Sequence, residues 1–223
     1  SFLLFKWLND LVRDSRILNP VSQLIGPNIL LWNTLFWIKE AGSKSFVSWH
    51  QDTKYWGLSS TNVVSAWIAL SPSSNKSGCL QVMPGTHVGE ILDHEDRYHS
   101  DNMLTRGQEI NEGLDESNAV SMPLKTGQMS IHNYRLAHSS GPNTSSDRRI
   151  GISIHYMPPD TKQIVGDWDC AMLVKGNDSF GNFVEAPIPA YDFDPISVAF
   201  HKKAADSINK VLYHNATVND HKL

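Results

Sequence analysis

The chain has 223 residues and a formal net charge of −4 at pH 7, and 40% of its residues are hydrophobic. This length can bury the core of one domain, and the slightly acidic balance excludes a large basic surface for nucleic acid. No apolar run approaches the roughly 18 residues that a membrane-spanning helix needs. Cys79 and Cys170 are too few for a disulfide framework and are typical of a reducing cytosol. We therefore expect a single cytoplasmic domain over residues 1–223, with no nucleic-acid or membrane partner.

Helical patterns occur at the two ends of the chain. Apolar residues recur at helical spacing from Phe2 to Val12 and again from Pro195 to Tyr213. A second short helix is expected between Asn19-Pro20 and Gly26-Pro27, because Asn is a common N-cap, proline suits the first turn and glycine often ends a helix. The chain does not begin with Met and carries no signal-peptide pattern, so we expect an N-terminal segment to precede Ser1.

Short runs rich in β-branched and aromatic residues begin at Ile29 and alternate with turn signals. The expected strands are Ile29 to Ile38, Val63 to Leu70, Leu80 to Met83, Ala119 to Leu124, Gln128 to His132 and Ile150 to Met157. Many short strands with Gly and Pro turns indicate a β-sandwich or barrel. The expected fold class is therefore mainly β with flanking helices.

A polar stretch from Gly89 to Asn118 separates two of these strands. It is too long for a tight connection, and long insertions in β folds are often lids or binding loops. We expect residues 89–118 to form a lid-like insert from which Arg106 and Gln108 reach a substrate. The alternative is that Arg106 only pairs with Glu109 or Glu112 on a solvated loop.

His50 and Asp52 are two residues apart, and on a strand such residues point to the same face. Two histidines and one carboxylate are the ligand set that holds non-haem Fe(II) and leaves positions open for other ligands. The structural alternative is that His50 and Asp52 form a pair at the end of a strand and hydrogen-bond to loop backbone. A second histidine ligand is therefore needed from elsewhere in the chain.

Arg149 shares one strand face with Gly151 and Ser153, whereas Arg148 falls on the opposite face. The small neighbours leave room for a ligand beside the guanidinium, which suits the two-point binding of a carboxylate. A plain surface cation at a strand start is the alternative.

The second histidine ligand has two candidates, His138 and His132. The alternative for His132 is that it is an ordinary strand histidine whose ring nitrogens are hydrogen-bonded within the protein. His87 is interpreted as a turn residue, and His94 and His99 as solvated residues of the polar insert.

Several segments together resemble the phytanoyl-CoA dioxygenase family. They are His50-Gln51-Asp52, Ser77 to His87, Gly127-Gln128-Met129, His138 to Gly141, and Arg149. They occur in order across residues 26 to 157, and an ordered set is far more specific than any one motif. The family consists of Fe(II)- and 2-oxoglutarate-dependent oxygenases built on a double-stranded β-helix, a jelly roll similar to the cupins.

The resemblance implies a role for each matching residue. The implied iron ligands are His50, Asp52 and His138. The implied co-substrate residues are Arg149, which would pair with the distal carboxylate of 2-oxoglutarate, and Gln51, Trp67 and Ser140. Related halogenases replace the carboxylate ligand with a small residue, and Asp52 keeps it. The implied activity is therefore the hydroxylation of a small organic substrate by O₂, with decarboxylation of 2-oxoglutarate to succinate.

Two other classes of function compete with this interpretation. A cupin-like isomerase or metal-binding module would use the same ligands without 2-oxoglutarate, but it has no evident need for a buried Arg149. A catalytically silent binding protein would be expected to lose a ligand, whereas all of the expected ligands are present. The substrate stays open among acyl-CoA, amino acid or amine, phosphonate and secondary metabolite, with a preference for a small polar molecule because no basic cluster suits a CoA phosphate.

Overall fold

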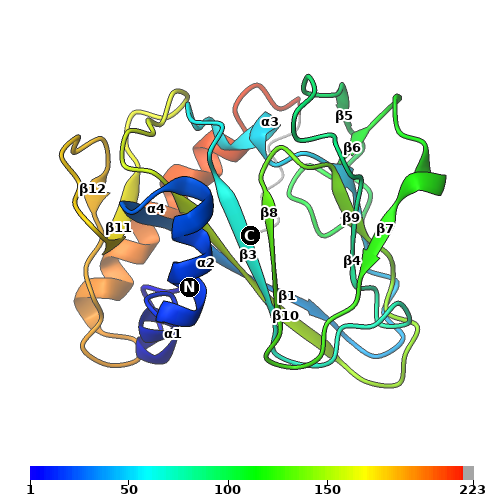
Figure 1. The fold of residues 1–223 in the computed structure, drawn as a ribbon, viewed down its shortest axis with the longest axis horizontal. Helices are drawn as coiled ribbons and strands as arrows, with labels where there is room; N and C mark the ends of the chain where they lie inside the picture. Colours follow the sequence, from blue (N-terminus) through cyan, green and yellow to red (C-terminus); the bar gives the residue numbers. More distant parts are fainter. Residues whose placement is uncertain (218–223) are drawn as a thin grey trace. The chain divides into compact units, whose positions relative to one another are not determined.

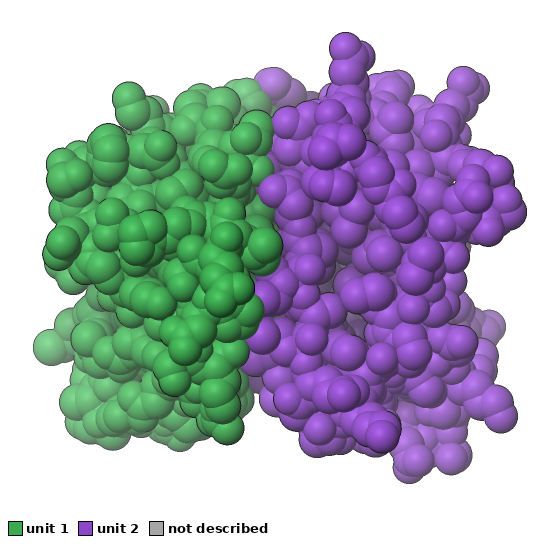
Figure 2. Space-filling model, viewed as in Figure 1, with its two compact units in different colours: residues 1–35, 56–66, 153–214 green, residues 36–55, 67–152, 215–223 purple. Residues whose placement is uncertain are grey.

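The computed structural model describes residues 1–217, which form two compact units (Figure 2). Unit 1 contains residues 1–35, 56–66 and 153–214, and unit 2 contains residues 36–55, 67–152 and 215–217. Three strands run from one unit into the other along the sequence. The expectation of one domain over residues 1–223 stays a prediction.

Three helices belong to unit 1: α1 (Lys6–Leu11), α2 (Ser15–Ile25) and α4 (Pro195–Leu212). The expected start of α2 at Asn19-Pro20 is wrong. The side chain of Asp14 accepts a hydrogen bond from the backbone N–H of Arg16 and caps the helix, so Pro20 lies inside it. An interior proline costs about 3 kcal/mol, and the burial of Ile17 and other apolar residues of α2 offsets this cost.

Hydrogen bonding orders six strands as β12-β11-β1-β10-β3-β8. Their bounds are β1 Ile29–Lys39, β3 Val64–Ala69, β8 Met129–Asn133, β10 Arg149–Met157, β11 Cys170–Lys175 and β12 Val184–Glu185. Within unit 1, β11 pairs antiparallel with β1 and parallel with β12. Strands β11 and β12 were not predicted from the sequence, whereas the other four strands were.

A second sheet lies entirely in unit 2, in the order β2-β9-β4-β7. Figure 1 labels its strands β9, β4 and β7. Its strands are β2 Val47–His50, β9 His138–Ser140, β4 Leu80–Val82 and β7 Val120–Met122, and all are paired antiparallel. Mostly antiparallel strands with a few helices agree with the expected class, mainly β. The β2–β9 pairing matters most for function, because it places His50 directly opposite His138.

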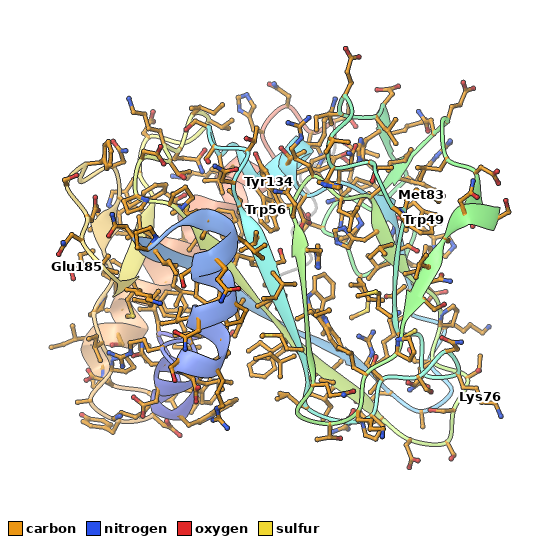
Figure 3. All side chains as sticks on the ribbon, in the orientation of Figure 1. Trp49, Trp56, Lys76, Met83, Tyr134 and Glu185 are labelled. Carbon is orange, nitrogen blue, oxygen red and sulfur yellow. The ribbon has the colours of Figure 1, made fainter. Side chains whose placement is uncertain are left out.

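The insert 89–118 folds as a β-hairpin rather than as an open polar loop. Strand β5 (His94–Asp96) pairs antiparallel with β6 (Gln108–Ile110), and a short 3-10 helix, η1 (Glu116–Asn118), follows. Ile110 packs in a buried cluster with Trp49 and Met83, which lie close together in Figure 3. The apolar residues of the insert thus anchor it to the segment that precedes His50. That it acts as a lid stays a prediction.

Candidate metal site and its surroundings

Three side chains of unit 2 form a group that could hold a metal ion. His50 ends β2, His138 begins β9, and Asp52 lies in the turn between β2 and the short helix α3 (Thr53–Trp56). One ligand atom from each residue lies within 4.8 Å of the others. Nε2 of His50 is 3.3 Å from Oδ1 of Asp52, and Nε2 of His138 is 4.0 Å from Oδ2. The structure therefore brings together the three residues that the sequence analysis assigned to iron.

The hydrogen bonds of the two histidines fit a metal. Nδ1 of His50 lies 2.9 Å from the backbone oxygen of Ser48, and Nδ1 of His138 lies 2.9 Å from that of Leu136. A carbonyl oxygen only accepts, so each Nδ1 carries a proton, and Nε2 is the ring nitrogen that lies toward Asp52 and could bind a metal. Burial is the main cause that lowers the pKa of His138 to about 3, so the ring is neutral at ordinary pH, as a ligand must be.

The geometric reason expected for this convergence is wrong in one respect. Asp52 does not share a strand with His50, because β2 ends at His50. The chain turns there, and the backbone oxygen of Asp52 accepts a hydrogen bond from the N–H of Tyr55 at 3.0 Å. The turn and the cross-strand pair of His50 with His138, whose ring centroids are 4.1 Å apart, together produce the cluster.

Arg149 is buried at the start of β10, with 2% of its surface exposed. Its guanidinium carbon lies 5.4 Å from the ring centroid of Trp67. Gly151 makes this packing possible, because a Cβ there would lie 2.0 Å from Cζ2 of Trp67. Burial lowers the pKa of Arg149 to about 10, and among residues 1–217 no carboxylate pairs with it. Arg148 is exposed and bonds to Glu40 at 2.8 Å, which confirms that the two arginines face opposite ways.

Lys39 is a buried cation that the sequence analysis missed. It ends β1 with 0% exposure, and its Nζ donates to the backbone oxygen of Ser140 at 3.0 Å, to its Oγ at 2.7 Å and to the oxygen of Gly141. Burial, and next the charge of Arg149, lowers the pKa of Lys39 to about 7. A lysine at a strand end is usually solvated, so no sequence pattern marked it. Two buried cations without a carboxylate partner in the described chain suit an anionic ligand.

Gln51 is hydrogen-bonded to two other segments of unit 2, one at Arg135 and one at Leu92 and His94. Its side-chain nitrogen donates to the backbone oxygen of Arg135 at 2.6 Å, and its side-chain oxygen accepts from the N–H of Leu92 at 2.8 Å. Its backbone N–H donates to Nε2 of His94 at 2.9 Å. The role of Gln51 beside a co-substrate stays a prediction.

His94 is not solvated, contrary to expectation. Its Nδ1 lies 2.7 Å from the oxygen of Leu92, and burial is the main cause that lowers its pKa to about 4. The ring therefore serves as a neutral acceptor for the backbone of Gln51. The insert is thus bonded to the residue that separates His50 from Asp52.

Arg106 pairs with Asp96 across the insert hairpin, so the expected alternative partners Glu109 and Glu112 are wrong. Its guanidinium carbon also lies 5.2 Å from the ring centroid of Tyr55. Gln108 is buried, and its side-chain oxygen accepts from the N–H of Arg106 at 3.1 Å. That either residue reaches a substrate stays a prediction.

His132 lies beside the metal group without belonging to it. Its ring centroid is 4.9 Å from that of His138, yet the three-residue group excludes it. Burial lowers the pKa of His132 to about 4, against the opposing charge of Asp52. Its Nδ1 is buried and has no hydrogen-bond partner within the described chain.

The phytanoyl-CoA dioxygenase (PhyH) family model matches residues 6–151, well over half of the chain. The chain belongs to this family. The probable alpha-ketoglutarate-dependent hypophosphite dioxygenase of Stutzerimonas stutzeri is 28% identical over 193 residues, covering 83% of this chain and 67% of that protein. The peroxisomal phytanoyl-CoA dioxygenase of Homo sapiens is 29% identical over 66% of this chain. The chain spans only 45% of the length of that human relative.

Solved structures support the fold and the chemistry of this PhyH family member. The apo structure of the non-heme monooxygenase ThoJ is 32% identical with a TM-score of 0.84, covering 95% of this chain and 77% of that one. CytC3 with Fe(II) and alpha-ketoglutarate is 26% identical with a TM-score of 0.61, covering 86% and 74%. These matches confirm the double-stranded β-helix. They also bear out the expected association of this fold with iron and 2-oxoglutarate.

Similarity of fold does not determine the reaction. The epimerase SnoN, solved with Fe3+ and alpha ketoglutarate, is 22% identical with a TM-score of 0.59, covering 70% of this chain and 60% of that one, and shares the fold alone.

Within residues 1–217, no helix is both long and apolar enough to cross a membrane.

Proposed function

We propose that this chain is an Fe(II)- and 2-oxoglutarate-dependent oxygenase that hydroxylates a C–H bond of a small organic substrate. The observation that carries the proposal is one compact unit holding both halves of the required site. His50, Asp52 and His138 converge within 4.8 Å, and the same unit buries Arg149 with no carboxylate partner among the described residues.

The three converging side chains would hold the iron. They supply two neutral nitrogen ligands and one carboxylate, which is the facial set that leaves three positions open. The carbonyl oxygens of Ser48 and Leu136 fix the ring orientations of His50 and His138. When bound, iron with 2-oxoglutarate and O₂ would supply the oxidising power, and the co-substrate would leave as succinate and CO₂.

Arg149 would bind the distal carboxylate of 2-oxoglutarate through two parallel hydrogen bonds. Trp67 fixes its guanidinium from one side, and Lys39 adds a second positive charge that also orients the hydroxyl of Ser140. A dicarboxylate would offset the cost of burying these cations. A cupin-like metal protein without 2-oxoglutarate provides no such anion, which favours the oxygenase over that alternative.

The insert 89–118 would exclude water from the iron site and contact the substrate. Its hairpin is bonded to Gln51 between two of the expected iron ligands, and its apolar residues pack on Trp49. A closed environment protects reactive chemistry from water. For the substrate we propose a small polar molecule.

The test is a library of candidate substrates incubated with Fe(II), 2-oxoglutarate and O₂, with succinate and hydroxylated product both quantified. We expect succinate formation that a true substrate increases. Asp52→Ala should abolish both products while the circular dichroism spectrum and the melting transition persist, because the change removes a ligand at a turn rather than core volume. Equal succinate formation by the wild type and Asp52→Ala would refute the proposed function.

A further inference from the structure

His94 of the insert contacts both ends of the turn that carries Asp52. Its Nε2 accepts a hydrogen bond from the backbone N–H of Gln51 at 2.9 Å, at the start of that turn. Its ring packs edge-on against the ring of Tyr55, with 5.7 Å between the centroids, at the other end of the turn. All four residues belong to unit 2, as do the other two expected metal ligands. His94 therefore brackets the segment from which Asp52 projects.

Leu92 fixes which ring nitrogen of His94 faces Gln51. Nδ1 of His94 lies 2.7 Å from the backbone oxygen of Leu92, so Nδ1 carries a proton and Nε2 is left as the acceptor. The N–H of Leu92 in turn donates to the side-chain oxygen of Gln51 at 2.8 Å. Three hydrogen bonds thus join the segment 92–94 and Gln51, and they keep the ring of His94 from turning away from the backbone that it binds.

The bond from Gln51 to His94 controls the direction in which the chain leaves β2. A peptide group is planar, so holding the N–H of Gln51 fixes the plane that joins Gln51 to His50. Gln51 has 0% exposure, and a buried backbone N–H without an acceptor destabilises the structure. The peptide therefore keeps this orientation because His94 accepts the hydrogen bond. Asp52 is the next residue, so the direction of its side chain depends on the same plane.

We propose that His94 is a positioning residue that aims the carboxylate of Asp52 at the metal. It acts through the backbone of Gln51 and lies outside the group of three residues that could hold the ion. This inference rests on the proposed function, because it takes Asp52 as a ligand together with His50 and His138. Partners that orient metal ligands change the metal affinity about 10–100-fold when they are removed. In this chain, that partner comes from the insert, whereas the two histidine ligands come from the sheet of β2 and β9.

The test is a titration of Co(II) into the metal-free protein, followed by the visible absorption of the bound ion. Sites of this type bind Co(II) more tightly than Fe(II), and the ligands and geometry of the site determine the absorption bands. His94→Phe keeps a ring of similar size but removes the acceptor. We expect it to weaken Co(II) binding on the order of ten-fold and to shift the bands toward those of Asp52→Ala, because the carboxylate is no longer aimed at the ion.

Two further variants separate positioning from a general effect on the fold. His94→Gln places an amide oxygen near the position of Nε2, so it should restore the wild-type bands and an affinity within about three-fold of wild type. His99→Phe is the matched control, because His99 is an exposed histidine of the same insert whose ring packs on that of Phe46. It should leave the bands unchanged and the affinity within about two-fold of wild type. Thermal melting of each metal-free variant measures any loss of stability.

The wild type and Asp52→Ala test the metal site itself. If the wild type does not bind Co(II), or if Asp52→Ala binds it equally, the proposed function and this inference are both wrong. If binding depends on Asp52 but His94→Phe equals the wild type in affinity and bands, the inference alone is wrong. Weaker binding by His94→Phe with unchanged bands, or altered bands that His94→Gln does not restore, would give His94 a merely structural role and also overturn the inference. Weaker binding with altered bands, both restored in His94→Gln, supports it.

Discussion

Replacing Gly151 with alanine should damage the Arg149 site through Trp67. The added Cβ would lie 2.0 Å from Cζ2 of Trp67, and 2.4 and 2.6 Å from two further ring carbons. Ordinary contact begins near 3.4 Å, so the ring must retreat by 3.4 − 2.0 = 1.4 Å. Trp67 is only 4% exposed and belongs to β3, and an interior packed at crystal density has little room for such a movement.

We expect Gly151→Ala to lower the free energy of unfolding by roughly 1–3 kcal/mol, the usual cost of overpacking. It should also weaken 2-oxoglutarate binding several-fold, because Arg149 loses the ring that fixes it; a cation–π contact contributes about 0.5–2 kcal/mol. Urea denaturation measures the first effect, and an anaerobic 2-oxoglutarate titration measures the second.

Gly89→Ala is the matched control, because a Cβ there would meet nothing closer than 3.9 Å. It should change neither measurement. If Gly151→Ala unfolds at the same urea concentration as wild type and binds 2-oxoglutarate equally, then Trp67 moves freely. Gly151 would then not set the position of Arg149.

Three other predictions concern the charged groups. Arg149→Lys should weaken 2-oxoglutarate binding on the order of 100-fold, because an ammonium cannot reproduce the two-point contact. Arg148→Lys changes an exposed ion pair and should have almost no effect on that binding. Equal effects of the two substitutions would contradict the strand faces assigned to Arg148 and Arg149. Burial lowers the pKa of Lys39 from 10.5 to about 7, and a dicarboxylate favours the charged form, so 2-oxoglutarate affinity should fall as pH rises above about 7. That slope should disappear in Lys39→Met, and its persistence would assign the titration to another group. Arg106→Ala should raise the substrate KM or uncouple succinate from product at unchanged 2-oxoglutarate affinity. Unchanged kinetics would give Arg106 a structural role, through contacts such as those with Asp96 and Tyr55.

Local pattern was sufficient to predict β10 and the opposite orientations of Arg149, its first residue, and Arg148, the residue before it. Strict alternation is a property of the strand itself, so Arg149 turned inward and Arg148 outward as expected. The same reasoning failed at Pro20, where a proline that usually starts a helix lies inside α2 because the apolar residues around it are buried. Tertiary packing overrode a local signal there.

The residues of the candidate site also divide into those that local sequence patterns predict and those that depend on tertiary packing. The residues that carry ordered motifs, His50, Asp52 and His138, were found from the sequence. Lys39 and His94 were not found from the sequence, because their burial depends on contacts with distant parts of the chain. Lys39 bonds to Ser140, and His94 bonds to Gln51. A cation at the end of a strand and a histidine in a polar stretch have solvated environments in most proteins, and only the fold distinguishes these two.

In the proposed oxygenase, the bonds of Gln51 would make metal loading and docking of the insert linked equilibria. Both would depend on Gln51, which lies between two of the expected iron ligands. Its backbone N–H donates to Nε2 of His94, and its side-chain oxygen accepts from the N–H of Leu92. Linkage is reciprocal, so a factor by which docking strengthens metal binding is also the factor by which the metal strengthens docking. The amide hydrogens of β5 and β6 would then exchange with solvent more slowly in the loaded protein. Substitutions far out on the hairpin would change metal affinity without contacting the ion.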